Sequence, residues 1–451
     1  MEKNTLYKLI SIILITFSVL YFFLGFYLDE NTAGAGGTNG DIFHIWNNLN
    51  IFINNDLVGS IIHPKYYDSR LPLAYMMHEF FNPFIDTKIE FRISVFIISL
   101  IVPILFFLCL KKRFKKSETL LLLLISSTVL LSPYFRTSAY WGLEENYGLI
   151  FLLLTFLFFN SFLKNENSTN FKLYLQVFFI TFLSSCCFYF DQKLIIIPII
   201  CFFQIILSQN IIKLKIIAIL FYFIFSIPFI YLVILWEGNI VHPTSAFRVA
   251  PTESLVLFNL GYTATIIAFY LFPILFFLNK NLLTAIQNFL ASKVNYYILF
   301  LIVIYVFYLA IFLNFADLDN SNLGWKKHIA GELYWESSLG KGVVHKLALI
   351  FFSNMYLREI FTYTSFLFSG IILLIFLNKH LKNALILLYF FILSLVLWPI
   401  LQEYFDPLML LMVFTFFNLK MSINYKNVIF LYGYLFLLLV GSNIYYTNLL
   451  N

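Results

Sequence analysis

The chain has 451 residues, of which 61% are hydrophobic and only 12% charged, and its formal net charge is +6. A soluble protein of this length could not bury so much apolar surface, so the composition predicts an all-α polytopic membrane protein. The small positive charge fits anchoring against anionic lipid and excludes nucleic acid as an expected partner. All four cysteines fall within predicted spans, where they cannot cross-link an outer loop.

Apolar runs of roughly 17–25 residues predict about thirteen transmembrane helices. They lie near residues 6–28, 92–110, 119–133, 147–163, 173–190, 194–212, 216–236, 256–278, 296–315, 360–377, 384–400, 408–419 and 428–446. Residues 347–357 are also apolar but too few to cross, so they predict an interfacial or re-entrant piece. We expect residues 1–451 to form a single transmembrane domain.

The distribution of charge predicts the orientation of these helices. With the N-terminus placed inside, every inner stretch carries at least two Lys or Arg residues, and all but three of the 23 carboxylates lie outside. The largest outer loops are then 29–91 and 316–358. We expect the chemistry on that outer face, in the plasma (inner) membrane of a prokaryote or the endoplasmic reticulum membrane of a eukaryote.

The first outer loop places a carboxylate and a histidine, Asp41 and His44, about one helical turn apart. Apolar residues recur at helical spacing over 41–53, which predicts an amphipathic helix able to lie on the membrane surface. A second short helix is predicted at 71–82. Asp41 falls in the first turn of its helix, where it could instead act only as an N-terminal cap.

The second outer loop, 134–146, brings Arg136 and two adjacent carboxylates, Glu144 and Glu145, to the edge of a span. Acids at this depth are costly without a partner, which favours a functional role over interfacial anchoring. Adjacent helical residues point in different directions, so we expect only one of the two acids to face a shared cleft.

Later outer segments add further polar residues. Asp191 and Lys193 stand in a tight turn and could simply neutralise one another. Six of the seven histidines lie outside, yet no metal-binding spacing such as His-Glu-x-x-His occurs, so no metal site and no cofactor are predicted, although a divalent metal is possible.

Four short sequence motifs, each at the outer edge of a predicted span, resemble those of a known family. They are Asp41-Ile42-Phe43-His44, Phe190-Asp191-Gln192-Lys193, Glu237-Gly238-Asn239-Ile240-Val241 and Gln402-Glu403-Tyr404-Phe405-Asp406-Pro407. In this order they resemble the GT-C superfamily of glycosyltransferases that use polyprenyl-phosphate-linked sugars. Within it they look most like the dolichyl-phosphoglucose α-1,2-glucosyltransferase family. The chain departs from that family's pattern at Gly40, where the family has a second acid, and at two positions where it has arginines.

The resemblance implies an inverting transfer in which a carboxylate deprotonates an acceptor hydroxyl and polyprenyl phosphate leaves. We expect Asp41 to be the base and His44 to orient it, with Glu144 or Glu145 holding sugar hydroxyls or acting as the base instead. The expected substrate-binding residues are Arg136, Gln192, Lys193, His242, Arg248, Arg358 and Glu403. The implied partners are a polyprenyl-phosphate-sugar donor, a glycan, lipid-linked or protein acceptor, and membrane lipid.

Three other classes remain open from the sequence. A lipid-linked polysaccharide polymerase or ligase would use the Arg and His residues of a large late loop, which the 316–358 loop provides. A glycolipid flippase or transporter would need a polar path through the spans, which is not evident. A purely structural membrane protein would not explain why carboxylates and histidines gather on one face.

Overall fold

The computed structural model describes residues 3–32, 40–68, 70–163, 171–208, 211–245, 253–278, 287, 292–313, 315, 325–329, 332–336, 341–377, 380–396 and 400–450. The chain divides into two compact units. Unit 1 comprises Met1–Phe247 together with Tyr432–Asn451, and unit 2 comprises Arg248–Leu431.

The described residues form an all-α protein apart from one short hairpin, and nine of their helices are long and apolar enough to cross a membrane. This agrees with the predicted class of multi-pass membrane protein. The nine spans are Thr5–Tyr27, Lys88–Arg113, Glu145–Leu163, Phe171–Phe190, Ile212–Leu235, Leu257–Phe277, Lys293–Phe312, Met355–Leu377 and Tyr425–Tyr446. A tenth is possible if Thr119–Leu131 and Pro133–Trp141, which meet at a bend of 65°, count as one broken span.

The prediction of about thirteen spans is therefore too high for the described part of the chain. The apolar runs near 194–212, 384–400 and 408–419 correspond to the helices α11 (Ile196–Ser208), α19 (Leu381–Val396) and α20 (Leu408–Thr415). At 1.5 Å per residue, the eight residues of α20 extend only about 12 Å, well short of a hydrocarbon core of about 30 Å. An apolar run thus predicts burial, but it does not fix how far a helix continues.

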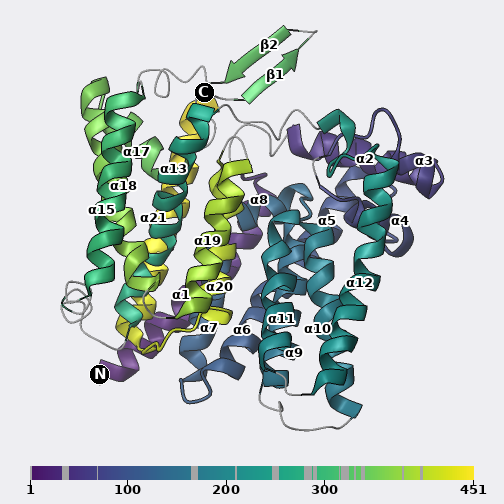
Figure 1. The fold of residues 1–451 in the computed structure, drawn as a ribbon, viewed down its shortest axis with the longest axis horizontal. Helices are drawn as coiled ribbons and strands as arrows, with labels where there is room; N and C mark the ends of the chain where they lie inside the picture. Colours follow the sequence, from purple (N-terminus) through teal and green to yellow (C-terminus); the bar gives the residue numbers. More distant parts are fainter. Residues whose placement is uncertain are drawn as a thin grey trace. The chain divides into compact units, whose positions relative to one another are not determined.

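Unit 1 contains the long helices α1 (Lys3–Tyr27), α9 (Glu145–Leu163), α10 (Phe171–Phe190) and α12 (Ile212–Leu235). Its α5 (Lys88–Ser99) and α6 (Ile101–Arg113) together form one span, and α7 (Thr119–Ser127), η2 (Thr128–Leu131) and α8 (Pro133–Trp141) form the bent pair. Helix α10 packs between α9 and α12. Three short helices, α2 (Ile42–Asn54), α3 (Leu57–Ile61) and α4 (Leu73–Phe81), gather near one end of α12 (Figure 1).

The two short helices predicted in the first outer loop are confirmed as α2 and α4. One face of helix α2 is buried, and α2 packs against α4. The buried residues of that face are Ile42, Ile45, Asn48, Leu49 and Phe52. The amphipathic face is therefore used, at least in part, to build unit 1.

Unit 2 contains α13 (Glu253–Leu271), η5 (Pro273–Phe277), α15 (Lys293–Phe312), α17 (Gly342–Phe351), α18 (Met355–Leu377), α19, η6 (Gln402–Tyr404) and α20. Of the apolar piece predicted at 347–357, residues 347–351 belong to α17, which is too short to span as expected, whereas residues 355–357 begin the span α18. The antiparallel strands β1 (Trp325–Ile329) and β2 (Glu332–Glu336) lie in the 316–358 loop and were not predicted.

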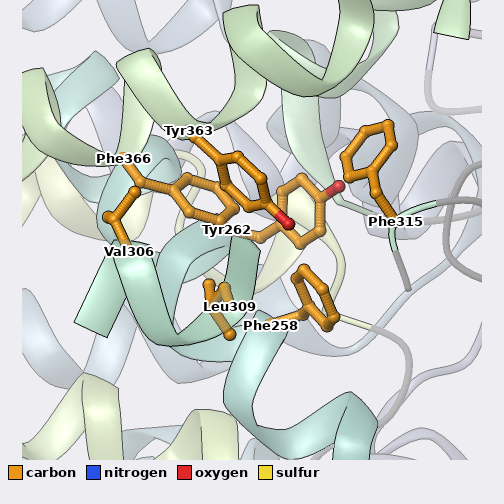
Figure 2. Close-up of a cluster of buried hydrophobic side chains, with 7 residues drawn as sticks. All are labelled: Phe258, Tyr262, Val306, Leu309, Phe315, Tyr363 and Phe366. Atoms are coloured by element: carbon orange, nitrogen blue, oxygen red, sulfur yellow. The ribbon is translucent and has the colours of Figure 1, made fainter. Parts of the chain in front are cut away.

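One hydrophobic core cluster of unit 2, mostly aromatic, lies between α13, α15 and α18. Figure 2 shows its seven side chains, which are Phe258, Tyr262, Val306, Leu309, Phe315, Tyr363 and Phe366. Gly261 permits this contact, because a Cβ atom there would lie 2.3 Å from the Phe366 ring. Close helix packing at a glycine is typical of membrane bundles.

Candidate active site

Polar side chains from three predicted outer loops meet at one end of unit 1. The Arg70 guanidinium, from the first loop, donates from Nη1 to Oε1 of Glu144, from the second loop, at 3.2 Å. The Thr244 hydroxyl, from the loop after α12, donates to the backbone oxygen of Tyr66 at 2.6 Å. The prediction that these loops share one side of the membrane is consistent with this convergence.

Arg70 binds both members of the acidic pair. Besides Glu144, it donates from Nη2 to Oε1 of Glu145. The prediction that only one of the two acids faces a shared site is wrong, because Glu144 precedes α9 and does not follow its helical spacing. Arg70 is the most accessible of the three, with 21% of its side chain exposed against 2% for Glu144 and 13% for Glu145.

The electrostatics of this cluster raise the pKa of both Arg70 and Glu144. Burial opposes the charge of Arg70, but Glu144, Glu145, Asp68 and Asp191 outweigh it and raise the pKa of Arg70 well above its ordinary value. Burial raises the pKa of Glu144 well above its usual range, and Asp68 and Glu145 add to this while Arg70 opposes it. A buried carboxyl with a raised pKa is a common feature of functional sites.

Asp68 extends the cluster through hydrogen bonds to groups from the first loop. Its Oδ2 accepts from the Tyr75 hydroxyl at 2.5 Å, and its Oδ1 accepts from the backbone N–H of Arg70 at 2.9 Å. The Tyr66 hydroxyl is fully buried and has no hydrogen-bond partner. Burial, with Asp68 and Glu144, raises the pKa of Tyr66 well above its ordinary value, so this unsatisfied hydroxyl lies close to the acids.

Asp41 occupies the N-cap position of α2, but its side chain makes no capping hydrogen bond to that helix. The geometry therefore does not support a role for Asp41 purely as a helix cap. Ile42, the next residue, packs near Gly142, so the start of α2 lies beside the segment that leads into Glu144. His44 is exposed, with its ring 5.3 Å from that of Tyr67.

Arg136 is fully buried and is committed to contacts inside unit 1. Its Nε donates to Oε1 of Glu30 at 2.8 Å, and its Nη1 and Nη2 donate to the backbone oxygens of Leu130 and Tyr21, each at 3.0 Å. The Nη2 group also pairs with Oε2 of Glu30. This arrangement favours a structural role for Arg136 over the substrate-binding role expected from the sequence.

The 191–193 turn lies in the same unit, and its charges do pair. Lys193 Nζ lies 3.3 Å from Oδ2 of Asp191, as the neutralising alternative anticipated. Gln192 donates from Nε2 to the backbone oxygen of Ile240 at 3.2 Å, which ties this turn to the loop after α12. His242 is buried, and burial lowers its pKa.

The remaining predicted residues belong to unit 2. Arg358 lies in the first turn of α18 and Glu403 in η6, whereas Arg248 lies outside the described residues. Within the described ranges, no group of three or more His, Cys, Asp or Glu side chains could hold a metal ion.

The sequence predictions missed Arg70 as a site residue. The expected substrate-binding residues all came from the second outer loop or later, whereas Arg70 reaches the acidic pair from the first loop, across more than seventy residues. The available signal was an arginine two residues after a carboxylate, in a loop of a chain with few charges.

The chain matches no known protein family, no curated protein and no solved structure.

Proposed function

We propose that the chain is a membrane glycosyltransferase, which moves a sugar from a polyprenyl-phosphate donor to an acceptor hydroxyl on the outer face. The observation that carries the proposal is the cluster in which Arg70 holds Glu144 and Glu145. Such a transfer needs a carboxylate of tuned basicity and a cation for the departing phosphate, and this cluster contains both.

In the proposed reaction, Glu144 accepts the proton of the acceptor hydroxyl. The freed oxygen attacks the anomeric carbon from the face opposite the phosphate. The bond between that carbon and the phosphate oxygen breaks, and its electron pair leaves with the phosphate. Arg70, the most accessible member of the cluster, stabilises the negative charge that develops on the leaving group.

Two features support Glu144 as the base. Burial raises its pKa, which makes the carboxylate a stronger base, and its contact with Arg70 fixes its position beside the cation. Asp41 is the alternative base, because the start of α2 lies beside the same segment and the Asp41 side chain does not cap its helix.

The test is transfer by the purified full chain, with polyprenyl-phosphate hexoses as donors and release of polyprenyl phosphate as the readout. Glu144→Gln should lower turnover by about 10²–10⁴-fold, the usual contribution of a general base. Glu118→Gln, which alters an exposed carboxylate paired with Lys8, is the matched control and should keep full turnover.

Asp41→Asn separates the two candidate bases. A large loss in Asp41→Asn with full turnover in Glu144→Gln would move the base to Asp41 and leave the activity intact. Full turnover in both folded variants would refute both Glu144 and Asp41 as the base. If the unaltered chain releases no polyprenyl phosphate from any hexose donor, the proposed function itself is wrong.

A further inference from the structure

The loop segment that carries Arg70 is held in place from two helices of unit 1. Asn48, buried on α2, binds the backbone of Tyr67 twice: the Tyr67 N–H donates to Oδ1 of Asn48 at 3.1 Å, and Nδ2 of Asn48 donates to the Tyr67 oxygen at 2.9 Å. The same Nδ2 donates to the hydroxyl of Tyr75, on α4, at 3.2 Å. Residues 66–68 belong to no helix or strand, so side chains fix this part of the loop.

Asp68 connects these side chains to Arg70. Its Oδ2 accepts from the Tyr75 hydroxyl, and its Oδ1 accepts from the Arg70 N–H at 2.9 Å. A carboxylate that accepts the N–H two residues further on forms an Asx turn, which sets the direction of the backbone there. A continuous chain of hydrogen bonds therefore runs from Asn48 through Tyr75 and Asp68 to Arg70, and through its guanidinium to the acidic pair.

The turn itself does not require the charge of Asp68. Asp68 is only 8% exposed, and no salt bridge among the described residues includes it. Burying a carboxylate without a paired cation is unfavourable, and an asparagine could accept from the same N–H and pair with the same hydroxyl. The negative charge has one effect that an asparagine would lack, because it raises the pKa of Glu144.

We propose that Asp68 is a positioning residue for the transferase centre, which fixes the backbone from which Arg70 reaches the acidic pair and strengthens Glu144 as a base through its charge. This inference rests on the proposed function. Asp68 acts through these two groups and does not itself contact the reacting atoms. It holds Arg70 where charge develops on the departing phosphate, and its charge favours transfer of the acceptor proton to Glu144. An Asx turn that only stabilised the loop would affect neither step.

Two substitutions at Asp68 separate its hydrogen bonds from its charge. Asp68→Ala removes both and should lower kcat by about 10²-fold with KM little changed, since a misplacement of about 1 Å can cost that much. Asp68→Asn can keep both hydrogen bonds but lacks the charge, so the pKa of Glu144 should fall. The acid limb of the pH profile of kcat/KM for release of polyprenyl phosphate should then move to lower pH.

The other groups that interact electrostatically with Glu144 are unchanged in Asp68→Asn, so a shift of the acid limb reports the charge of Asp68. These groups are Arg70, Glu145, Tyr66, Tyr75 and Tyr147. Asp56→Asn is the matched control, because it makes the same change to an exposed carboxylate of the same loop. Asp56 caps α3 by accepting from the Gly59 N–H, and asparagine is an equally good cap, so both kcat and the acid limb should stay unchanged.

The position of Arg70 can also be measured without catalysis. Phenylglyoxal labels accessible arginines, and mass spectrometry of the full chain gives the labelling rate at Arg70. This rate should be higher in Asp68→Ala than in the unaltered chain or in Asp56→Asn, because the guanidinium is no longer directed at the acidic pair. Tyr75→Phe, which removes only the hydroxyl from Asp68, should cause a smaller change in the same direction. Thermal unfolding confirms that each variant is folded.

An unmoved acid limb in folded Asp68→Asn would overturn the proposal. Unchanged labelling of Arg70 in folded Asp68→Ala would also overturn it, and if Asp68→Ala does not fold, unchanged labelling in Tyr75→Phe has the same consequence. If the unaltered chain transfers no sugar, the proposed function is wrong, and the labelling of Arg70 alone decides whether Asp68 positions it.

Discussion

The buried histidine of α4 makes the stability of unit 1 sensitive to mild acid. His78 is 5% exposed, and burial lowers its pKa to about 4. Its hydrogen bonds explain why the neutral ring is preferred. Asn82 directs its amide nitrogen at His78 Nδ1 (2.8 Å) and also at Ser94 Oγ (2.8 Å), so Nδ1 must accept and Nε2 carries the hydrogen toward the Tyr147 hydroxyl at 2.9 Å. Protonation of Nδ1 would set two donors against each other.

The sign and size of the effect follow from the shift in pKa. An unfolded histidine has a pKa near 6.5, so between about pH 6.5 and pH 4 the open form binds a proton that the folded form does not, and stability falls as the pH falls. A shift from 6.5 to about 4 corresponds to roughly 3.4 kcal/mol in total. From pH 7 to pH 5 the expected loss is about 1.8 kcal/mol, or a 20-fold rise in the population of opened α4.

Hydrogen exchange over residues 73–81, corrected for the pH dependence of intrinsic exchange, measures this opening. Glu144 acts in the opposite sense, because its raised pKa means that protonation in mild acid favours the folded state. The wild type is therefore compared with His78→Gln, which cannot titrate and should lose the dependence assigned to His78. If the two proteins show the same change between pH 7 and pH 5, the reasoning is refuted.

Three further predictions follow from contacts in unit 1. Arg136→Gln should cost about 3–5 kcal/mol, since it leaves the buried carboxylate of Glu30 without its cation, and the double variant with Glu30→Gln should cost less; thermal unfolding in detergent measures both, and a single variant as stable as the double would contradict a structural role. Gly142→Ala should destabilise by about 1–3 kcal/mol, because its φ is +81° and its Cβ would lie 2.6 Å from the Phe91 ring; Phe91→Leu should restore part of the loss, and unchanged stability would argue against the close contact. A cysteine at exposed Asn55, in a chain without its native cysteines, should react with impermeant maleimide added from the outer side, and labelling only after permeabilisation would reverse the predicted orientation.

The local elements of the candidate site were predictable, whereas its contacts were not. Helix α2 followed from apolar spacing, because burying one face of a helix requires that pattern. The pairing of Arg70 with Glu144 and Glu145 depends on how the first loop folds over the start of α9, which no local pattern contains. The helical argument about the two acids failed for the same reason, since it assumed that Glu144 lies within the helix.

Hydropathy did not predict the lengths of the helices, for a related reason. Hydropathy reports which residues avoid water, and in a bundle this includes short helices that are enclosed by protein, as all eight residues of α20 are. Hydropathy also did not predict the bend between η2 and α8, although Pro133 at the first position of α8 is typical of a helix start.

The motif at residues 402–407, which contributed to the family resemblance, has a clear physical role in unit 2. Gln402 accepts from Val343 N–H through Oε1 and donates from Nε2 to the Tyr270 hydroxyl at 2.9 Å, so it holds the start of α17 against α13. That contact supports the turn before α17, in which Lys341 and Gly342 have backbone φ values of 62° and 76°. Gln402→Leu should therefore destabilise the protein by about 1–3 kcal/mol in thermal unfolding, because it leaves the Val343 N–H and the Tyr270 hydroxyl without this partner. If Gln402→Leu is as stable as the unaltered chain, Gln402 does not hold the start of α17 against α13.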